Sequence, residues 1–242
     1  MKICAKSDIG KSRKINQDSF GYYVADSGLG FLIVADGMGG HRAGEVASQV
    51  AVDTLIAGAK NVISLKDKEQ ISEFIQVELR KANDLILYKA TASEEMSGMG
   101  TTAVTAVIDE TKVIIGNVGD SRAYIISNDK ISQITTDHSY VEQLLKAGSI
   151  DEEEARNHPR SNEITRAIGD KFYTAPDIFE YEYKSGDILL LCSDGLNKMV
   201  RDSDILDIIK SNEDPERMCD CLIQAANDAG GRDNITTIVV LF

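Results

Sequence analysis

The sequence predicts an α+β protein built as a four-layer αββα sandwich, with two antiparallel sheets packed face to face and helices outside. Two observations lead to this fold class. The predicted strands follow one another mostly as hairpins, and amphipathic helices are grouped between the sets of strands. Hydrophobic residues make up 43% of the 242 residues, which supports a core large enough for two packed sheets. A doubly wound parallel sheet is excluded by the hairpin order.

The strands are predicted from short apolar runs that are rich in β-branched residues. They are expected at residues 2–6, 19–25, 30–35, 101–108, 112–118, 122–127, 178–183, 187–193 and 235–241. The polar pairs Asp109-Glu110 and Asn128-Asp129 are typical of hairpin turns between such strands.

Apolar residues spaced three and four apart predict the helices. Helices are expected over residues 43–59, 68–91, 139–147 and 203–211, and an acidic stretch follows the third at 151–156. Asp202 or Ser203 is expected to cap the fourth helix. Asp214 and Pro215 open a last helix, and Gly230 ends it. No Ser/Gly tract interrupts the chain, so residues 1–242 are expected to form a single domain.

Composition excludes several classes of partner. The formal net charge is −13 and the pI is about 4.7, which argues against nucleic acid or an anionic membrane. The opening MKICAKSDIG has no apolar signal region, so a cytoplasmic protein is expected. The four cysteines are expected to be reduced thiols; they are Cys4, Cys192, Cys219 and Cys221. A cysteine phosphatase is excluded because Lys198, Ala225 and Asn227 stand where its arginine would follow.

Four aspartates adjoin the predicted strands. Asp36, Asp120 and Asp194 each end an apolar run, and Asp233 comes just before the last one. Two carboxylates ~4 Å apart repel by about 4 kcal/mol at an effective dielectric constant near 20, so a cluster of four requires cations. The histidines are too scattered for zinc, and oxygen ligands indicate Mg²⁺ or Mn²⁺. Each short motif alone is equally typical of an ordinary turn, and only the recurrence favours a site.

Eight motifs in a fixed order resemble the bacterial branch of the PPM family, the type 2C metal-dependent protein serine/threonine phosphatases. They are R-x-x-N-x-D-S, A-D-G-M-G-G, S-G-M-G-T-T, G-D-S-R, T-x-D-H-S, I-T-R-A-I-G, S-D-G and R-D-N. The resemblance runs from about residue 8 to 242. It implies a PP2C-like αββα sandwich with a binuclear metal centre at one end.

The resemblance also implies a set of metal ligands. Asp36 would bridge two Mn²⁺ or Mg²⁺ ions, and Gly37 would bind one of them through its carbonyl. Asp194 and Asp233 would complete the carboxylate set. Asp120 would hold a third, weaker ion that it shares with Asp194.

Further roles follow from the same resemblance. Asp18 would hold a metal-bound water, and Arg13, flanked by Lys11 and Lys14, would grip the substrate phosphate. Residues 139–165 resemble a mobile flap beside the site, whereas 97–102 are expected to serve the strand turn.

Two residues depart from the pattern of better-known eukaryotic members. Met38 stands where a histidine is proposed as the general acid, and Gln17 replaces a glutamate. The proton donor therefore stays open, with His41 a candidate by proximity alone.

The expected function is hydrolysis of phosphoserine and phosphothreonine in proteins by a metal-bridging water. The alternative is a catalytically silent phosphoprotein-binding module on the same fold. The resemblance implies phosphorylated proteins as substrates and a cognate bacterial Ser/Thr kinase as a partner. The protein is expected to be a monomer.

Overall fold

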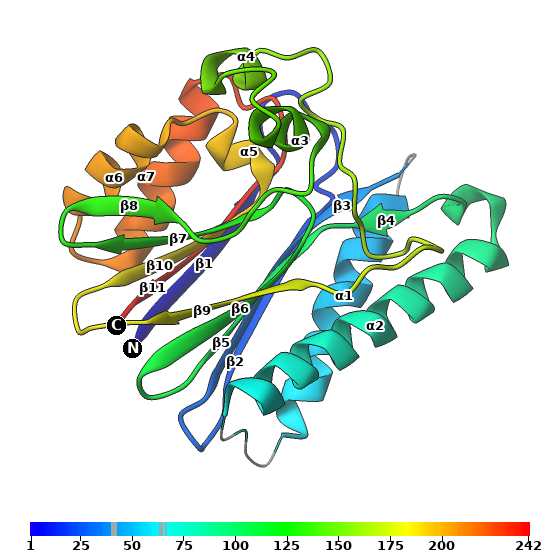
Figure 1. Ribbon diagram of the computed structural model, residues 1–242, viewed down its shortest axis with the longest axis horizontal. Helices are drawn as coiled ribbons and strands as arrows, with labels where there is room; N and C mark the ends of the chain where they lie inside the picture. The colour runs from blue at the N-terminus through cyan, green and yellow to red at the C-terminus, as the bar shows by residue number, and fades with distance from the viewer. Residues whose placement is uncertain (40–42, 63–64, 66) are drawn as a thin grey trace.

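The computed structural model describes residues 1–39, 43–62, 65 and 67–242. Within these residues the strands form two antiparallel sheets (Figure 1). The first sheet has the order β1 (Lys2–Asp8), β11 (Ile235–Leu241), β10 (Ile188–Cys192), β7 (Arg122–Ser127) and β8 (Lys130–Gln133). The second has the order β2 (Asp18–Val24), β3 (Gly30–Met38), β5 (Ala103–Ile108), β6 (Lys112–Val118) and β9 (Asp177–Glu182), and β4 (Gly100–Thr101) pairs with β3.

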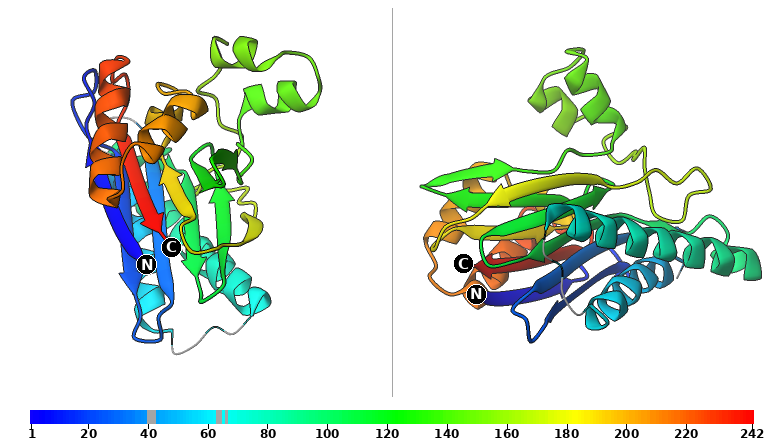
Figure 2. Two further views of the ribbon diagram at one scale, coloured as in Figure 1. Left: turned by 90° about the vertical axis from the view of Figure 1, so that its left-hand side faces the viewer. Right: turned by 60° about the horizontal axis from the view of Figure 1, so that its bottom comes forward.

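Helices cover the outer faces of both sheets. The second sheet carries α1 (Ala43–Lys60) and α2 (Lys68–Ala92), and the first carries α5 (Asp194–Asn197), α6 (Asp202–Lys210) and α7 (Pro215–Asp228). A short 3₁₀ helix, η1 (Glu94–Met96), follows α2. The remaining two, α3 (Tyr140–Lys146) and α4 (Glu152–Arg156), stand out from the body at one end of the sandwich (Figure 2). No helix in the described ranges is long and apolar enough to cross a membrane.

The side chains of β3 show why the strands are continuously apolar. Phe31 and Ile33 belong to the core under α1 and α2, whereas Leu32 and Val34 belong to the core between the sheets. Alternate residues of a strand point to opposite faces, and here both faces are buried. A third core lies between the first sheet and α5–α7. The predicted four-layer αββα sandwich is therefore confirmed.

Most predicted elements are present, with four differences. β8 has no counterpart among the nine expected ranges, because its four residues KISQ lie at a partly exposed sheet edge. The acidic stretch 151–156 forms α4, capped by a reciprocal capping box. Asp194 opens a helical turn, α5, that was not expected. The capping prediction for Asp202 or Ser203 is wrong: α6 begins at Asp202 after Arg201, without a side-chain cap.

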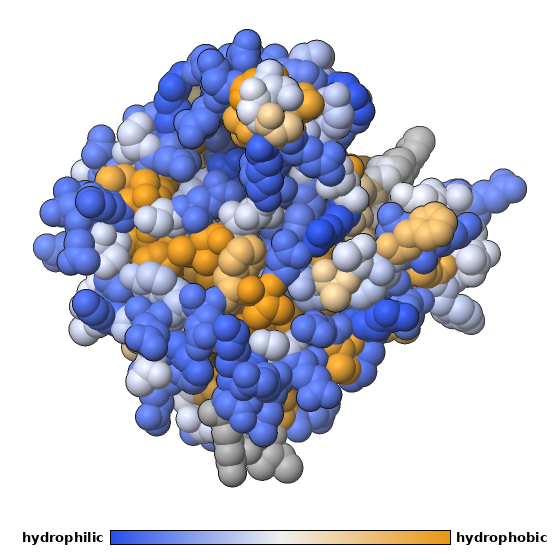
Figure 3. Space-filling model, viewed as in Figure 1, coloured by the Kyte–Doolittle hydropathy of each residue, from blue (hydrophilic) through white to orange (hydrophobic). Residues whose placement is uncertain are grey.

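The surface is mainly polar. The face seen in Figure 3 is largely hydrophilic, with hydrophobic groups gathered near its middle. Phe172 and Tyr88 are among the exposed aromatic residues, at 90% and 74% of full exposure.

Candidate functional site

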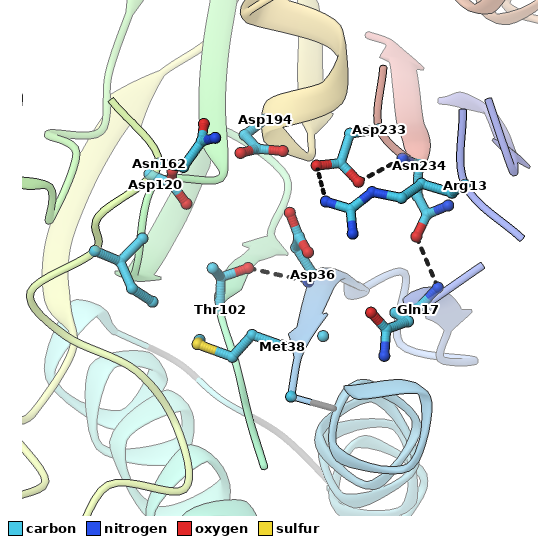
Figure 4. A pocket seen from close by; sticks show the side chains of 13 residues that line it. Arg13, Gln17, Asp36, Met38, Thr102, Asp120, Asn162, Asp194, Asp233 and Asn234 are labelled. Atoms are coloured by element: carbon cyan, nitrogen blue, oxygen red, sulfur yellow. Dashed lines mark hydrogen bonds and ion pairs between the residues drawn. The ribbon is translucent and has the colours of Figure 1, made fainter. Parts of the chain in front are cut away.

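A cavity of about 220 Å³ opens at the end of the sandwich where the aspartate-bearing segments meet. Figure 4 shows four carboxylates around it, contributed by β3, by the loop after β6, by α5 and by the segment before β11. Its lining residues are Arg13, Gln17, Asp36, Gly37, Met38, Gly39, Thr102, Asp120, Asn162, Ile164, Asp194, Asp233 and Asn234. Residues from seven separated segments thus converge on one space.

Asp36 lies inside β3, two residues before its end, rather than just beyond a strand. Its backbone N–H donates to Thr102 Oγ1 at 3.0 Å, and its carbonyl accepts from the Thr102 N–H and the Thr101 hydroxyl, each at 2.9 Å. The two threonines therefore hold Asp36 in place. The sequence analysis assigned residues 97–102 to the strand turn and did not predict that Thr101 and Thr102 hold Asp36.

Asp18 pairs with Asp36 in the register of β2 and β3. Its Oδ2 accepts hydrogen bonds from the hydroxyls of Ser193 at 2.6 Å and Thr236 at 2.7 Å. Its Oδ1 is buried and has no partner among the described residues. Asp18 is thus anchored through one oxygen, and the other remains able to accept.

Gly37 allows the backbone of the site to approach α1. A Cβ at this position would lie 2.1 Å from the Gly44 carbonyl oxygen and 2.6 Å from the Gln17 carbonyl oxygen. The Gly37 N–H donates to that Gln17 carbonyl at 3.1 Å. Any side chain at position 37 would force β3 away from the start of α1.

Arg13 and Asp233 form an ion pair at the rim of the cavity. Arg13 Nη2 donates to Asp233 Oδ2 at 2.7 Å, and the arginine side chain is half exposed. The hydrogen bond that Arg13 donates to Asp233 is the largest cause of a raised pKa for Arg13. Lys11 instead lies 3.6 Å from Asp228, so this flanking lysine is paired away from the arginine.

Asn234 fixes the loop that carries Arg13. Its Nδ2 donates to the carbonyls of Ile9 at 2.9 Å and Ile15 at 3.1 Å, and its Oδ1 accepts from the Gln17 N–H at 2.8 Å. Asn234 is the last letter of the R-D-N motif, and the sequence interpretation used only the aspartate.

Lys198 was also missed. It follows Asp194 by four residues, so the α5 turn brings its ammonium back to that carboxylate. Lys198 Nζ contacts Asp194 Oδ2, Asp120 Oδ2 at 3.3 Å and Asn162 Oδ1 at 3.0 Å. Burial lowers the pKa of Lys198, but attraction to Asp194 and Asp120 outweighs it, and the pKa is raised.

His138 supports the turn that carries Asp120. Its Nδ1 accepts from the Gly119 N–H at 3.1 Å, and its Nε2 lies 3.2 Å from Asp177 Oδ2. Burial is the main cause of the lowered pKa of His138, which keeps the ring neutral and Nδ1 able to accept. The T-x-D-H-S motif thus contributes to the site through the turn at Gly119, next to Asp120.

Burial and mutual repulsion dominate the electrostatics of the cavity. Burial is the first cause that raises the pKa of Asp18 and of Asp120 to about 7, and neighbouring carboxylates add to it. The pKa of Asp36 is raised well above its ordinary value for the same two reasons. Ionised carboxylates here need cations in addition to those the chain supplies.

The donor set fits a hard divalent ion. It consists of carboxylate and carbonyl oxygens, and the buried Oδ1 atoms of Asp18 and Asp194 have no hydrogen-bond partner in the described part of the chain. Within that part, no three acidic, cysteine or histidine side chains stand together as a ready-made ligand set. Arg13 and Lys198 hold oxygens of Asp233, Asp120 and Asp194 instead. His41 lies outside the described residues.

Comparisons with known proteins agree with this geometry. The family model described as Protein phosphatase 2C matches residues 12–235. The serine/threonine phosphatase Stp of Listeria welshimeri serovar 6b is 41% identical over 235 residues, which cover 97% of this chain and 93% of the relative.

Solved structures give the same result. Serine/threonine phosphatase Stp1 from Staphylococcus aureus matches with a TM-score of 0.94 and 37% identity, covering 100% of this chain and 94% of that one. The catalytic domain of the serine/threonine protein phosphatase PstP, solved in complex with two manganese ions, matches with a TM-score of 0.86 and 32% identity. That match covers 98% of this chain and 96% of the other.

Proposed function

Because this chain belongs to the protein phosphatase 2C family and is a metal-dependent protein serine/threonine phosphatase, we propose that the carboxylate-lined cavity is its active site. The observation that carries the proposal is the convergence of four aspartates from distant parts of the sequence on one space. We assign the two-ion site to Asp36, the Gly37 carbonyl, Asp194 and Asp233. Bound Mn²⁺ or Mg²⁺ supplies an activated water nucleophile and neutralises charge on the phosphoryl oxygens.

The residues of the chain bind and orient around those ions. Thr101 and Thr102 hold the backbone of Asp36 through hydrogen bonds to its N–H and carbonyl, which fixes the point from which its carboxylate extends. Asp18 acts through a water at Oδ1, because its Oδ2 already accepts from Ser193 and Thr236. No covalent bond to the enzyme is part of this mechanism.

Arg13 binds the substrate phosphate in this proposal. Its guanidinium is half exposed at the cavity rim, and a planar fork suits phosphate oxygens. Only Nη2 of Arg13 is engaged by Asp233, and a guanidinium has five N–H donors, so others are available for phosphate oxygens. Met38 lines the cavity but cannot donate a proton, so the general acid is left unassigned.

We further propose that residues 1–242 act as one phosphatase domain with a flap at about 139–165. α3 and α4 stand out from the body at one end of the sandwich (Figure 2), and Asn162, which follows α4, lines the cavity (Figure 4). Limited proteolysis of the full chain checks this: a single cleavage region near the flap is expected, and two stable halves would contradict a single domain.

Phosphorylated proteins are the substrates of this enzyme class. We propose that this chain is a monomer in the cytoplasm and that it removes phosphate groups added by a bacterial Ser/Thr kinase. Phosphoproteomics of a deletion strain would identify its substrates through the phosphosites that accumulate. The catalytically silent alternative gains no support, because Arg13 and all the proposed ligands are present.

A direct test is metal removal. Chelator-treated protein should lose hydrolysis of a phosphothreonine peptide, and added Mn²⁺ or Mg²⁺ should restore it. Thiol-directed inhibitors should have no effect, since none of the four cysteines lines the cavity. Full activity after chelation would overturn the mechanism.

A further inference from the structure

Lys198 places a positive charge between two of the cavity aspartates. Its side chain is 27% exposed, while those of Asp120 and Asp194 are 6% and 12% exposed. Its three contacts are Asp120 Oδ2, Asp194 Oδ2 and Asn162 Oδ1. An ammonium has three N–H donors, so these three acceptors use its full capacity.

The backbone around Lys198 is held from two sides. Its N–H donates to the Asp194 carbonyl at 2.9 Å, which closes the α5 turn. From α4, Arg156 Nη1 donates to the carbonyls of Asn197 at 3.2 Å and Lys198 at 3.4 Å. The backbone of Lys198 is therefore fixed, and its side chain extends from there to Asp120.

The two oxygens of Asp194 have different environments. Oδ2 accepts from Lys198, whereas Oδ1 is buried without a hydrogen-bond partner among the described residues. One oxygen can therefore serve the paired ions while the other stays with the lysine. By contrast, a third divalent ion held by the Oδ2 atoms of Asp120 and Asp194 would compete with Lys198, whose ammonium already contacts both.

We propose that the Lys198 ammonium is a built-in counter-cation for Asp120 and Asp194 and takes the position of a third divalent ion. The protein then holds two ions tightly and binds a third only weakly. The contact with Asn162 also ties residues 139–165 to this internal cation. This inference rests on the proposed two-ion site, because Asp194 belongs to both arrangements.

The test is a Mn²⁺ titration of the chelator-stripped full chain, with stoichiometry from calorimetry and from the electron paramagnetic resonance of free Mn²⁺. Lys198→Met keeps the side-chain length and removes the charge. We expect two tight ions in the wild type and a third in Lys198→Met, bound about tenfold or more tightly than in the wild type. Lys210→Met removes a partly exposed lysine on α6 and should leave the count at two.

A second variant tests whether the added ion binds at Asp120. Lys198→Met combined with Asp120→Asn should return the count to two, because the new ion loses its carboxylate. Wild-type protein that binds three ions of similar affinity would overturn the inference without any variant. Retention of the third ion in the double variant would overturn it as well.

Thermal unfolding gives a readout independent of activity. Metal-free Lys198→Met should unfold at a lower temperature than the wild type, and saturating Mn²⁺ should raise its Tm by more than it raises the wild-type Tm. Equal gains would count against the inference. Unchanged affinity for the paired ions in Asp36→Asn would instead refute the proposed two-ion site, whatever Lys198 does.

Discussion

Two charged regions of this molecule are built in opposite ways. Arg122 and Asp137 form a closed pair: Nε lies 2.9 and 3.1 Å from the two carboxylate oxygens, and Nη2 lies 2.8 Å from Oδ2. Nη1 donates to the Tyr124 hydroxyl at 2.8 Å. Burial lowers the pKa of Arg122, but Asp137 and Tyr124 more than offset this, and the pKa is raised.

The cavity carboxylates, by comparison, have too few hydrogen-bond donors and positive charges around them. Asp18 and Asp194 each leave a buried oxygen without a partner in the described ranges, and the pKa of Asp36 is raised well above its usual value by burial and by Asp18. A paired buried charge contributes to a defined structure, whereas an unpaired one is costly unless a ligand arrives. The difference separates the part of the sandwich that maintains the fold from the part that binds.

The largest expected effect is on catalysis. Asp36→Asn should lower kcat on a phosphopeptide on the order of 1,000-fold or more and weaken binding of the paired ions, because it removes their shared ligand. The metal-free Tm should stay the same or rise, since a buried carboxylate with a raised pKa is removed. Calorimetry, a kinetic assay and a thermal scan measure the three quantities. A metal-free Tm that falls would contradict the comparison.

A substitution in the Arg122–Asp137 pair should lower the stability of the fold and leave metal binding unchanged. Asp137→Asn leaves the Arg122 charge uncompensated and should cost about 3–5 kcal/mol of unfolding free energy in urea titrations. The affinity of the folded protein for Mn²⁺ should change little. Asp129→Asn is the matched control: its partner Lys210 lies at the surface, so a change of about 0.5 kcal/mol or less is expected. Equal losses in the two variants would refute the assignment.

Removal of the Arg13 guanidinium at the rim of the cavity should affect substrate binding. Arg13→Ala should raise KM and lower kcat/KM on a phosphopeptide, because a charge-assisted contact is lost. The loss of transition-state stabilisation should be about 1.5–3 kcal/mol. Lys11→Ala, which removes a lysine paired with Asp228, should have a smaller effect. If Arg13→Ala and the wild type have equal kcat/KM, Arg13 does not bind the phosphate.

A further effect concerns the pH dependence of stability, and it is confined to the metal-free protein. Asp18 and Asp120 have pKa values raised from 3.8 to about 7 by burial first, so each binds a proton more tightly in the folded protein than in the unfolded chain. Their contribution to metal-free stability is complete below pH 3.8 and is lost as pH rises through 7. The loss reaches at most about 1.4 kcal/mol per pH unit and group between these values. Denaturant titrations of metal-free protein at pH 5 and pH 7 measure it, and Asp18→Asn should reduce the slope.

The sequence predicts those parts of the molecule that periodicity controls. Apolar runs located the strands of both sheets, and the motif order located the aspartates. Contacts that depend on how loops fold were missed: Lys198 became visible only when α5 closed a turn after Asp194. Asn234 was missed for the same reason, since its three backbone partners lie more than 200 positions earlier in the sequence. β8 was missed because its alternation is short and lies at an edge.

The position of β11 has a consequence for how the protein is made. β11 lies between β1 and β10, pairing Lys2 with Leu241 on one side and Ile188 with Leu241 on the other. Until residues 235–241 emerge from the ribosome, the first sheet lacks an inner strand and the cavity lacks Asp233 and Asn234. Pairing over such a separation is slow because the loop-closure entropy must be paid first. A nascent chain therefore lacks a complete cavity until β11 has been inserted between β1 and β10.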